Sequence, residues 1–208
     1  MEYIDKLRLW MDAMAHPGKA TKRALGVKEA LRLYYSLAVI PIVLGLIVMY
    51  AVGGFNPFSA SSMSMSKAVP PLFGVHNIHN VATGVGYTLL LFLIITPFDM
   101  LVNSAIYHLL IGKLFKIYNK RYSKVFAAVF FGALPALLVD WLYPAGILGV
   151  VIISIFGLWG LVVEIIALSN QLGMSRIKAL GTIVLYVAAV VVVAFAVGLL
   201  VPLALKAF

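Results

Sequence analysis

The sequence predicts an all-helical integral membrane protein, built as a bundle of five transmembrane helices. Hydrophobic residues make up 63% of the 208 residues and charged residues only 11%, whereas about 25% of a soluble domain is charged. Long apolar runs account for most of the chain, and each has the roughly 20 residues that a helix needs to cross a bilayer core of about 30 Å. The runs cover about residues 31–52, 85–110, 125–143, 147–168 and 177–205.

The Lys and Arg residues predict the orientation of these helices. Fourteen of the sixteen lie up to the start of the first run or in the gaps after the second and fourth runs, and only Lys67 and Lys206 lie elsewhere. The positive-inside rule therefore predicts a cytosolic N-terminus and a C-terminus outside. The same placement accounts for the formal net charge of +9, because basic residues at membrane ends meet anionic headgroups. We expect no nucleic acid partner.

Residues 1–30 form a cytosolic segment before the membrane domain of residues 31–208. Up to the break at His16-Pro17-Gly18, apolar residues recur at steps of three and four, which gathers them on one face of a helix. They are Tyr3, Ile4, Leu7, Trp10, Met11 and Met14. We expect an amphipathic helix that lies in the headgroup region or packs under the bundle. A helix that binds a partner protein is the alternative.

A long outer loop, residues 53–84, separates the first two runs. Gly53-Gly54 and Pro70-Pro71 break regular structure, and the large apolar side chains between them favour a loop that folds back over the outer face. His76 and His79 would share one face of a helix and could bind one metal ion. Two histidines fall short of a tetrahedral ligand set, so we expect hydrogen-bonded imidazoles and no metal.

Asp99 is the first of the predicted intramembrane polar residues. It lies near the middle of the second run, just after Pro97, whose ring and missing amide hydrogen disrupt a helix. Asn103 follows four residues later on the same face, while Ser104 and His108 turn toward the other side. An acid at this depth costs about 2.5 to 3.5 kcal/mol and requires partners. Asp99 is either a brace for backbone groups freed by Pro97 or a functional site.

Glu164 is the second intramembrane acid. Gly157, Gly160 and Glu164 follow steps of three and four, so the acid extends a stripe of small residues along which a neighbouring helix can approach closely. We expect Glu164 to point into the bundle. Its simplest partner is a cytosolic cation, and a proton or ion site is the alternative. The candidate cations are Lys113, Arg176 and Lys178.

Asp140 and His108 are secondary candidates. Asp140 lies beside Trp141, Tyr143 and Pro144, a composition typical of the aromatic belt at the outer end of a membrane helix. The chain has no cysteine, which excludes disulfides, thiolate nucleophiles and Cys-ligated zinc. It also has no Gly-rich phosphate loop, HExxH or GxSxG motif. We therefore expect a protein that is not an enzyme and binds no cofactor.

Residues 104–202 resemble the Yip domain family, membrane proteins named for binding Ypt/Rab GTPases. The resemblance rests on the segments 105–110, Gly157-Leu158-Trp159 and 168–175, together with Tyr122-Ser123, Pro135 and the basic opening of the last run at 176–180. It implies five spans and a non-enzymatic membrane organiser that associates with itself. The short N-terminal tail, without the Asp-Leu-Tyr-Gly-Pro motif of eukaryotic members, implies a prokaryotic-type member in the cytoplasmic membrane.

Two functions of different class follow. The first is a scaffold or adaptor that recruits a cytosolic protein or shapes the bilayer, with the acids as internal braces. The second is a channel or transporter for protons, cations or a small polar solute, which would use Asp99, Asn103 and Glu164. Five spans allow no simple tandem or inverted repeat, and this favours the scaffold.

Overall fold

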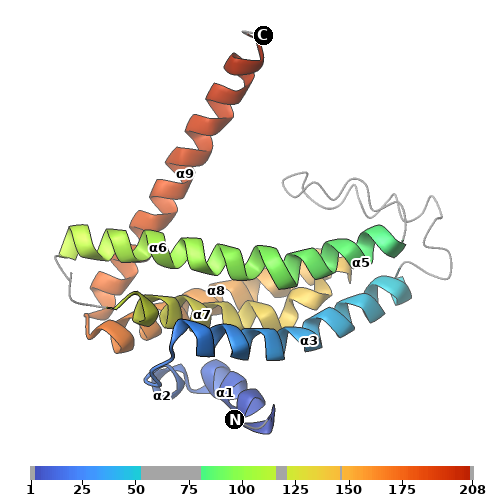
Figure 1. Cartoon of the computed structure of the whole chain (residues 1–208), viewed down its shortest axis with the longest axis horizontal. Coiled ribbons are helices and arrows are strands. Elements are labelled where there is room, and N and C mark those ends of the chain that lie inside the picture. The colour runs from blue at the N-terminus through green and yellow to red at the C-terminus, as the bar shows by residue number, and fades with distance from the viewer. Residues whose placement is uncertain (1–2, 53–80, 116–120, 146, 207–208) are drawn as a thin grey trace.

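The computed structural model describes residues 3–52, 81–115, 121–145 and 147–206, and all regular elements within these ranges are helical (Figure 1). The predicted all-helical class is confirmed. Four helices in the described ranges are long and apolar enough to cross a membrane: Val27–Val48, Thr88–Lys113, Tyr122–Leu142 and Leu148–Leu172. A fifth span and the orientation of the bundle stay predictions. His76, His79 and most of the outer loop lie outside the described residues.

The first four apolar runs form the body of the bundle. The first run forms α3 (Val27–Val52), and the second forms α5 (Val81–Leu90), the π-helical segment η3 (Leu91–Ile95) and α6 (Thr96–Phe115). The third forms α7 (Tyr122–Val139), which continues as the 3-10 segment η4 (Asp140–Ala145), and the fourth forms α8 (Ile147–Leu172). These helices run side by side in Figure 1.

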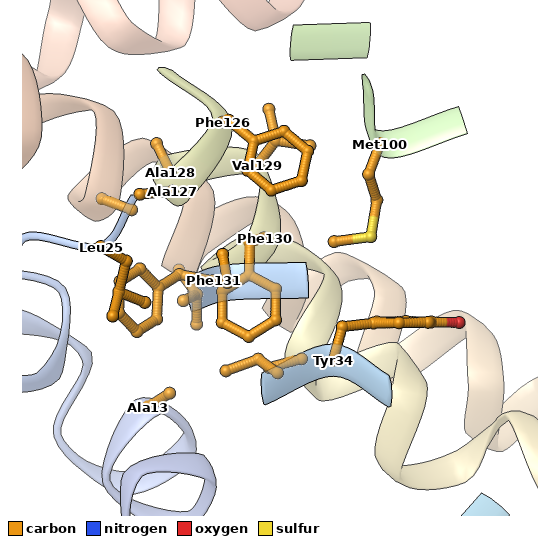
Figure 2. Packing of buried hydrophobic residues seen from close by; sticks show 14 of the residues in the cluster. Ala13, Leu25, Tyr34, Met100, Phe126, Ala127, Ala128, Val129, Phe130 and Phe131 are labelled. Atoms are coloured by element: carbon orange, nitrogen blue, oxygen red, sulfur yellow. The ribbon is translucent and has the colours of Figure 1, made fainter. Parts of the chain in front are cut away.

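The helix α7 lies at the centre of the bundle. Its residues are buried without interruption from Val125 to Gly132, and a helix that is apolar and buried all round belongs in a core. Figure 2 shows Phe126 and Phe130 of α7 among Tyr34 of α3 and Met100 of α6. The helices α3, α6 and α8 all contact α7, which therefore fixes their positions relative to one another.

The last helix, α9 (Arg176–Lys206), differs from the others in its packing. Gly173 ends α8 with a φ of 65°, a left-handed conformation that glycine adopts without strain and that commonly follows a helix. The chain then turns into α9, whose contacts are with α8 and α6. Figure 1 shows that the C-terminal half of α9 runs away from the other helices.

The N-terminal segment contains two short helices, α1 (Tyr3–Ala15) and α2 (Pro17–Ala20), which meet at the predicted break. Leu9, Trp10 and Ala13 are buried, and α1 contacts both α7 and α3. The indole Nε1 of Trp10 donates to the carbonyl oxygen of Leu134 at 2.9 Å. Leu134 lies about 18 Å along α7 from its first residue, so α1 packs against the side of the bundle. The position of α1 relative to the headgroup region stays a prediction.

Candidate functional site

The predicted contact between Asp99 and Asn103 is present on α6. The Asn103 Nδ2 donates to the Asp99 Oδ2 at 2.8 Å, and the Tyr186 hydroxyl of α9 donates to the Asn103 Oδ1. Asp99 is exposed at the bundle surface and Asn103 is half-buried. The four-residue spacing brought the two polar side chains together, whereas Tyr186 comes from a helix far away in the sequence.

A π-helical segment, η3, precedes Pro97 and changes the role expected for Asp99. In an α-helix the carbonyl of Leu93 would accept from residue 97, and proline has no amide hydrogen to donate. The Tyr35 hydroxyl of α3 donates to that carbonyl at 3.2 Å. Asp99 bonds to Asn103 instead. Among the described residues a tyrosine of another helix, and not Asp99, therefore donates to the freed carbonyl. Whether Asp99 is an internal brace or a functional site stays a prediction.

Two further carbonyls of η3 also accept from side-chain hydroxyl groups. The Tyr34 hydroxyl, which is buried, donates to the carbonyl of Phe92 at 2.7 Å, and the Thr96 hydroxyl donates to that of Leu91 at 3.0 Å. Backbone groups inside a bilayer have no water as an alternative partner, so irregular segments there depend on such side-chain donors. The Tyr34-Tyr35 pair on α3 thus stabilises the π-helical segment η3 of the second span.

Glu164 points into the bundle, as predicted, at a close approach of α7 and α8. Its side chain is only 9% exposed. A Cβ built on Gly132 would lie 2.7 Å from the Glu164 Cβ, and one built on Gly160 would lie 2.6 Å from the carbonyl oxygen of Gly132. Both glycines are therefore required by the packing. Gly157, the other member of the predicted stripe, has nothing within 4 Å of its Cβ position, so the stripe is shorter than predicted.

The partner of Glu164 differs from the predicted one. Within the described residues Glu164 has no ion pair; its carboxyl interacts with the Tyr107 hydroxyl of α6, and its Oε1 has no hydrogen-bond partner. Lys178 lies over the Phe115 ring instead, 6.0 Å from its centroid. Lys113 and Arg176 are exposed. The predicted pairing with a cation was wrong because the cations remain near the helix ends, away from the buried acid.

Two tyrosines connect the acids into one polar seam, which we define as Asp99, Asn103, Tyr186, Tyr107 and Glu164. The Tyr107 and Tyr186 rings meet edge to face with centroids 4.6 Å apart. Asp99, Asn103 and Tyr107 recur at four-residue steps, so helical periodicity places Tyr107 on the face of the two predicted residues. That signal was overlooked. No sequence pattern pointed to Tyr186.

The secondary candidates lie away from the polar seam. The ring of His108 packs at 89° to that of Tyr122, with centroids 6.0 Å apart, on the side of α6 that the helical spacing predicts. Asp140 is half-buried where η4 begins, and the neighbouring Trp141 donates to the carbonyl of Leu138 at 2.7 Å. No three His, Cys, Asp or Glu side chains in the described ranges are close enough together to hold a metal ion.

A second polar cluster fastens the N-terminal segment to the end of α8. The Gln171 Nε2 donates to the carbonyls of Thr21 at 2.6 Å and Arg23 at 2.7 Å, and the Asn170 Nδ2 donates to the Thr21 Oγ1 at 2.8 Å. Thr21 and Gln171 are buried. We call this cluster, Thr21 and Arg23 with Asn170 and Gln171, the N-terminal latch. It uses residues from the segment 168–175 on which the family resemblance partly rests.

Indole groups fix α1 itself. The Trp10 bond to Leu134 holds it on α7, and the Nε1 of Trp159 on α8 donates to the carbonyl of Met14 at 3.1 Å. The contacts leave a mixed surface exposed, with Ile4 73% and Met11 64% exposed beside the exposed Arg8. The N-terminal segment is therefore an integral part of the fold that presents charged and apolar side chains outward.

Comparisons with protein-family models, with curated proteins and with solved structures found no match to this chain. The resemblance to the Yip domain family stays a prediction. The features of the molecule that bear on its function are the polar seam, the N-terminal latch and the exposed surface of α1.

Proposed function

We propose that the protein is a non-enzymatic membrane scaffold that presents α1 and the loop after it on a rigid helical bundle. The observation that carries this proposal is the attachment of the N-terminal segment. Side chains of α8 and a carbonyl of α7 bind it at both ends, through Gln171, Trp159 and Leu134. Holding this segment in one conformation costs chain entropy but gives an ordered surface, which suits a protein that binds through that surface.

The packing around Glu164 supports the same function. The space between α7 and α8 would not admit a methyl group on Gly132 or Gly160 without a shift, so a solute has no room to pass between these helices there. A packed interior gives a stiff platform, because close-packed cores transmit strain and deform little. The buried Glu164 then serves as an internal polar contact, in agreement with the class of protein that the family resemblance implies.

The height of α1 on the bundle indicates how the scaffold meets the bilayer. Arg8 and Asp12 lie within one turn of Trp10. The Trp10 indole bonds to the Leu134 carbonyl, which lies about 18 Å along α7 from the first residue of that helix. Charged side chains on the outer face of α1 require water or headgroups at that level. We propose that the membrane is a prokaryotic cytoplasmic membrane and that its cytosolic leaflet is thinned beside α1. A hydrophobic surface shorter than the bilayer core causes such local thinning. The exposed face then contacts headgroups and a cytosolic protein.

A photo-cross-linking residue tests this proposal. Placed at Met11, on the exposed face of α1, it should capture headgroup-region lipid and one discrete cytosolic protein in native membranes. The control position is Ile155 of α8, which is 59% exposed and should yield acyl-chain products only. The same products at both positions would contradict the scaffold.

Transport is the second candidate, and one observation favours it. The Glu164 Oε1 is buried without a hydrogen-bond partner, and such an atom in a membrane helix is a typical mark of a proton or ion site. Flux of protons, sodium and potassium in proteoliposomes separates the two functions. The scaffold predicts no flux above protein-free vesicles. Conduction that Asp99→Asn or Glu164→Gln alone abolishes would establish a transporter and refute the scaffold.

A further inference from the structure

The exposure of Asp99 is a feature that the scaffold function does not use. Asp99 is 11 residues after Thr88 and 14 before Lys113, the ends of its candidate span, or about 17 and about 21 Å along the helix axis. Long lysine and arginine side chains reach the headgroups from inside a bilayer, but an aspartate is too short. Its carboxyl group therefore lies at the middle of the apolar layer.

The surroundings of Asp99 on the bundle surface are apolar. On α6 the neighbouring Phe98 is 65% and Val102 39% exposed. Among the described residues, the hydrogen-bond partner of Asp99 is Asn103. Ionisable groups at this depth almost always face protein or a water-filled cavity. Within the part of the chain that the structure describes, this requirement is unmet, because the Asp99 side chain is exposed.

The course of α9 leaves the same surface open. Tyr186 holds α9 on α6 through Asn103 and Tyr107. Beyond that contact, Figure 1 shows α9 diverging from the bundle. A surface with a polar group at mid-depth and a rim of exposed apolar residues matches an interface between membrane helices, where polar side chains bond across the contact.

We propose that this face, formed by Phe98, Asp99 and Val102 of α6, binds the same face of a second copy of the chain. Two copies inserted in the same orientation share a two-fold axis along the membrane normal, which brings identical residues together at equal depth. A carboxyl group that keeps its proton both donates and accepts, so the two Asp99 side chains are complementary to each other. Each also accepts from its own Asn103. The inference is independent of the scaffold function.

Single cysteines test the interface, since the chain contains none of its own. Val102→Cys places a thiol on the proposed face. Leu158→Cys is the matched control, because Leu158 is 66% exposed on α8 and lies at a similar depth, 14 residues before Leu172. Both variants are reconstituted as full chains in lipid vesicles and oxidised. The Val102→Cys variant should form disulfide-linked dimer several-fold faster than the Leu158→Cys variant. Dilution with lipid should lower the cross-linking rate of the Leu158→Cys control only.

Changes at Asp99 in the Val102→Cys protein show whether the carboxyl group is the contact. Asp99→Asn keeps a donor and an acceptor and should retain most of the cross-linking, whereas Asp99→Leu should reduce it to the control rate. Equal rates for the two cysteine positions in otherwise unchanged protein would overturn the proposal without reference to any Asp99 variant. Cross-linking at 102 that falls on lipid dilution as the control does would also overturn it.

Discussion

Alanine at Gly160 and at Gly157 should have opposite effects on stability, although the two glycines lie one turn apart on α8. A Cβ on Gly160 would lie 2.6 Å from the carbonyl oxygen of Gly132, and side-chain carbons essentially never come within 3.0 Å of such an atom. The obstacle is backbone, so no rotamer change can relieve it. At Gly157 a Cβ meets nothing within 4 Å.

The expected magnitude follows from two terms. Replacing glycine by alanine inside a helix gains roughly 0.5 to 1 kcal/mol in backbone entropy, and this gain is common to both positions. Forcing an extra carbon into a packed contact costs about 1 to 3 kcal/mol, and only Gly160→Ala incurs it. The free energy of unfolding of Gly160→Ala should therefore be about 1 to 3 kcal/mol below that of Gly157→Ala.

Unfolding by titration with SDS, followed by circular dichroism of the protein in mild detergent micelles, measures this difference. Because both variants add the same methyl group to the same helix, changes in hydrophobicity cancel. A combined Gly160→Ala and Glu164→Ala variant should recover nothing, since the obstacle is the Gly132 carbonyl. Equal stability of the two single variants would refute the close approach of α7 and α8.

Three further predictions concern the π-helical segment η3, the N-terminal latch and the orientation of the bundle in the membrane. Tyr34→Phe should lower the free energy of unfolding, measured by the same SDS titration, by about 1 to 3 kcal/mol, because the buried Phe92 carbonyl loses its donor. Tyr35→Phe should lower it by less than about 1 kcal/mol. A larger loss for Tyr35→Phe than for Tyr34→Phe would contradict the role given to Tyr34. Gln171→Leu should speed tryptic cleavage at residues 22–23 as followed on gels, whereas an unchanged rate would argue against the latch. A membrane-impermeant reagent should label residues 113–124 only from inside, and outside labelling would contradict the orientation.

Local periodicity was sufficient for several features of the site. The spacing of Asp99 and Asn103 predicted their contact, and the steps from Gly160 to Glu164 predicted an acid that faces a neighbouring helix. These predictions succeeded because a helix places residues three and four apart on one face whatever surrounds it. The all-helical class followed from composition, since apolar runs inside a bilayer must satisfy their own backbone groups.

The tertiary structure decided which groups meet across the bundle. Tyr34 donates to a carbonyl 58 positions away, and Gln171 donates to carbonyls 148 and 150 positions away. Tyr107 replaced the predicted cation beside Glu164. Such contacts have no local signature, because a hydroxyl or amide donor is satisfied by any acceptor that packing brings within about 3 Å. The sequence determined which residues share a helix face, and only the packing of helices determined which faces share an interior.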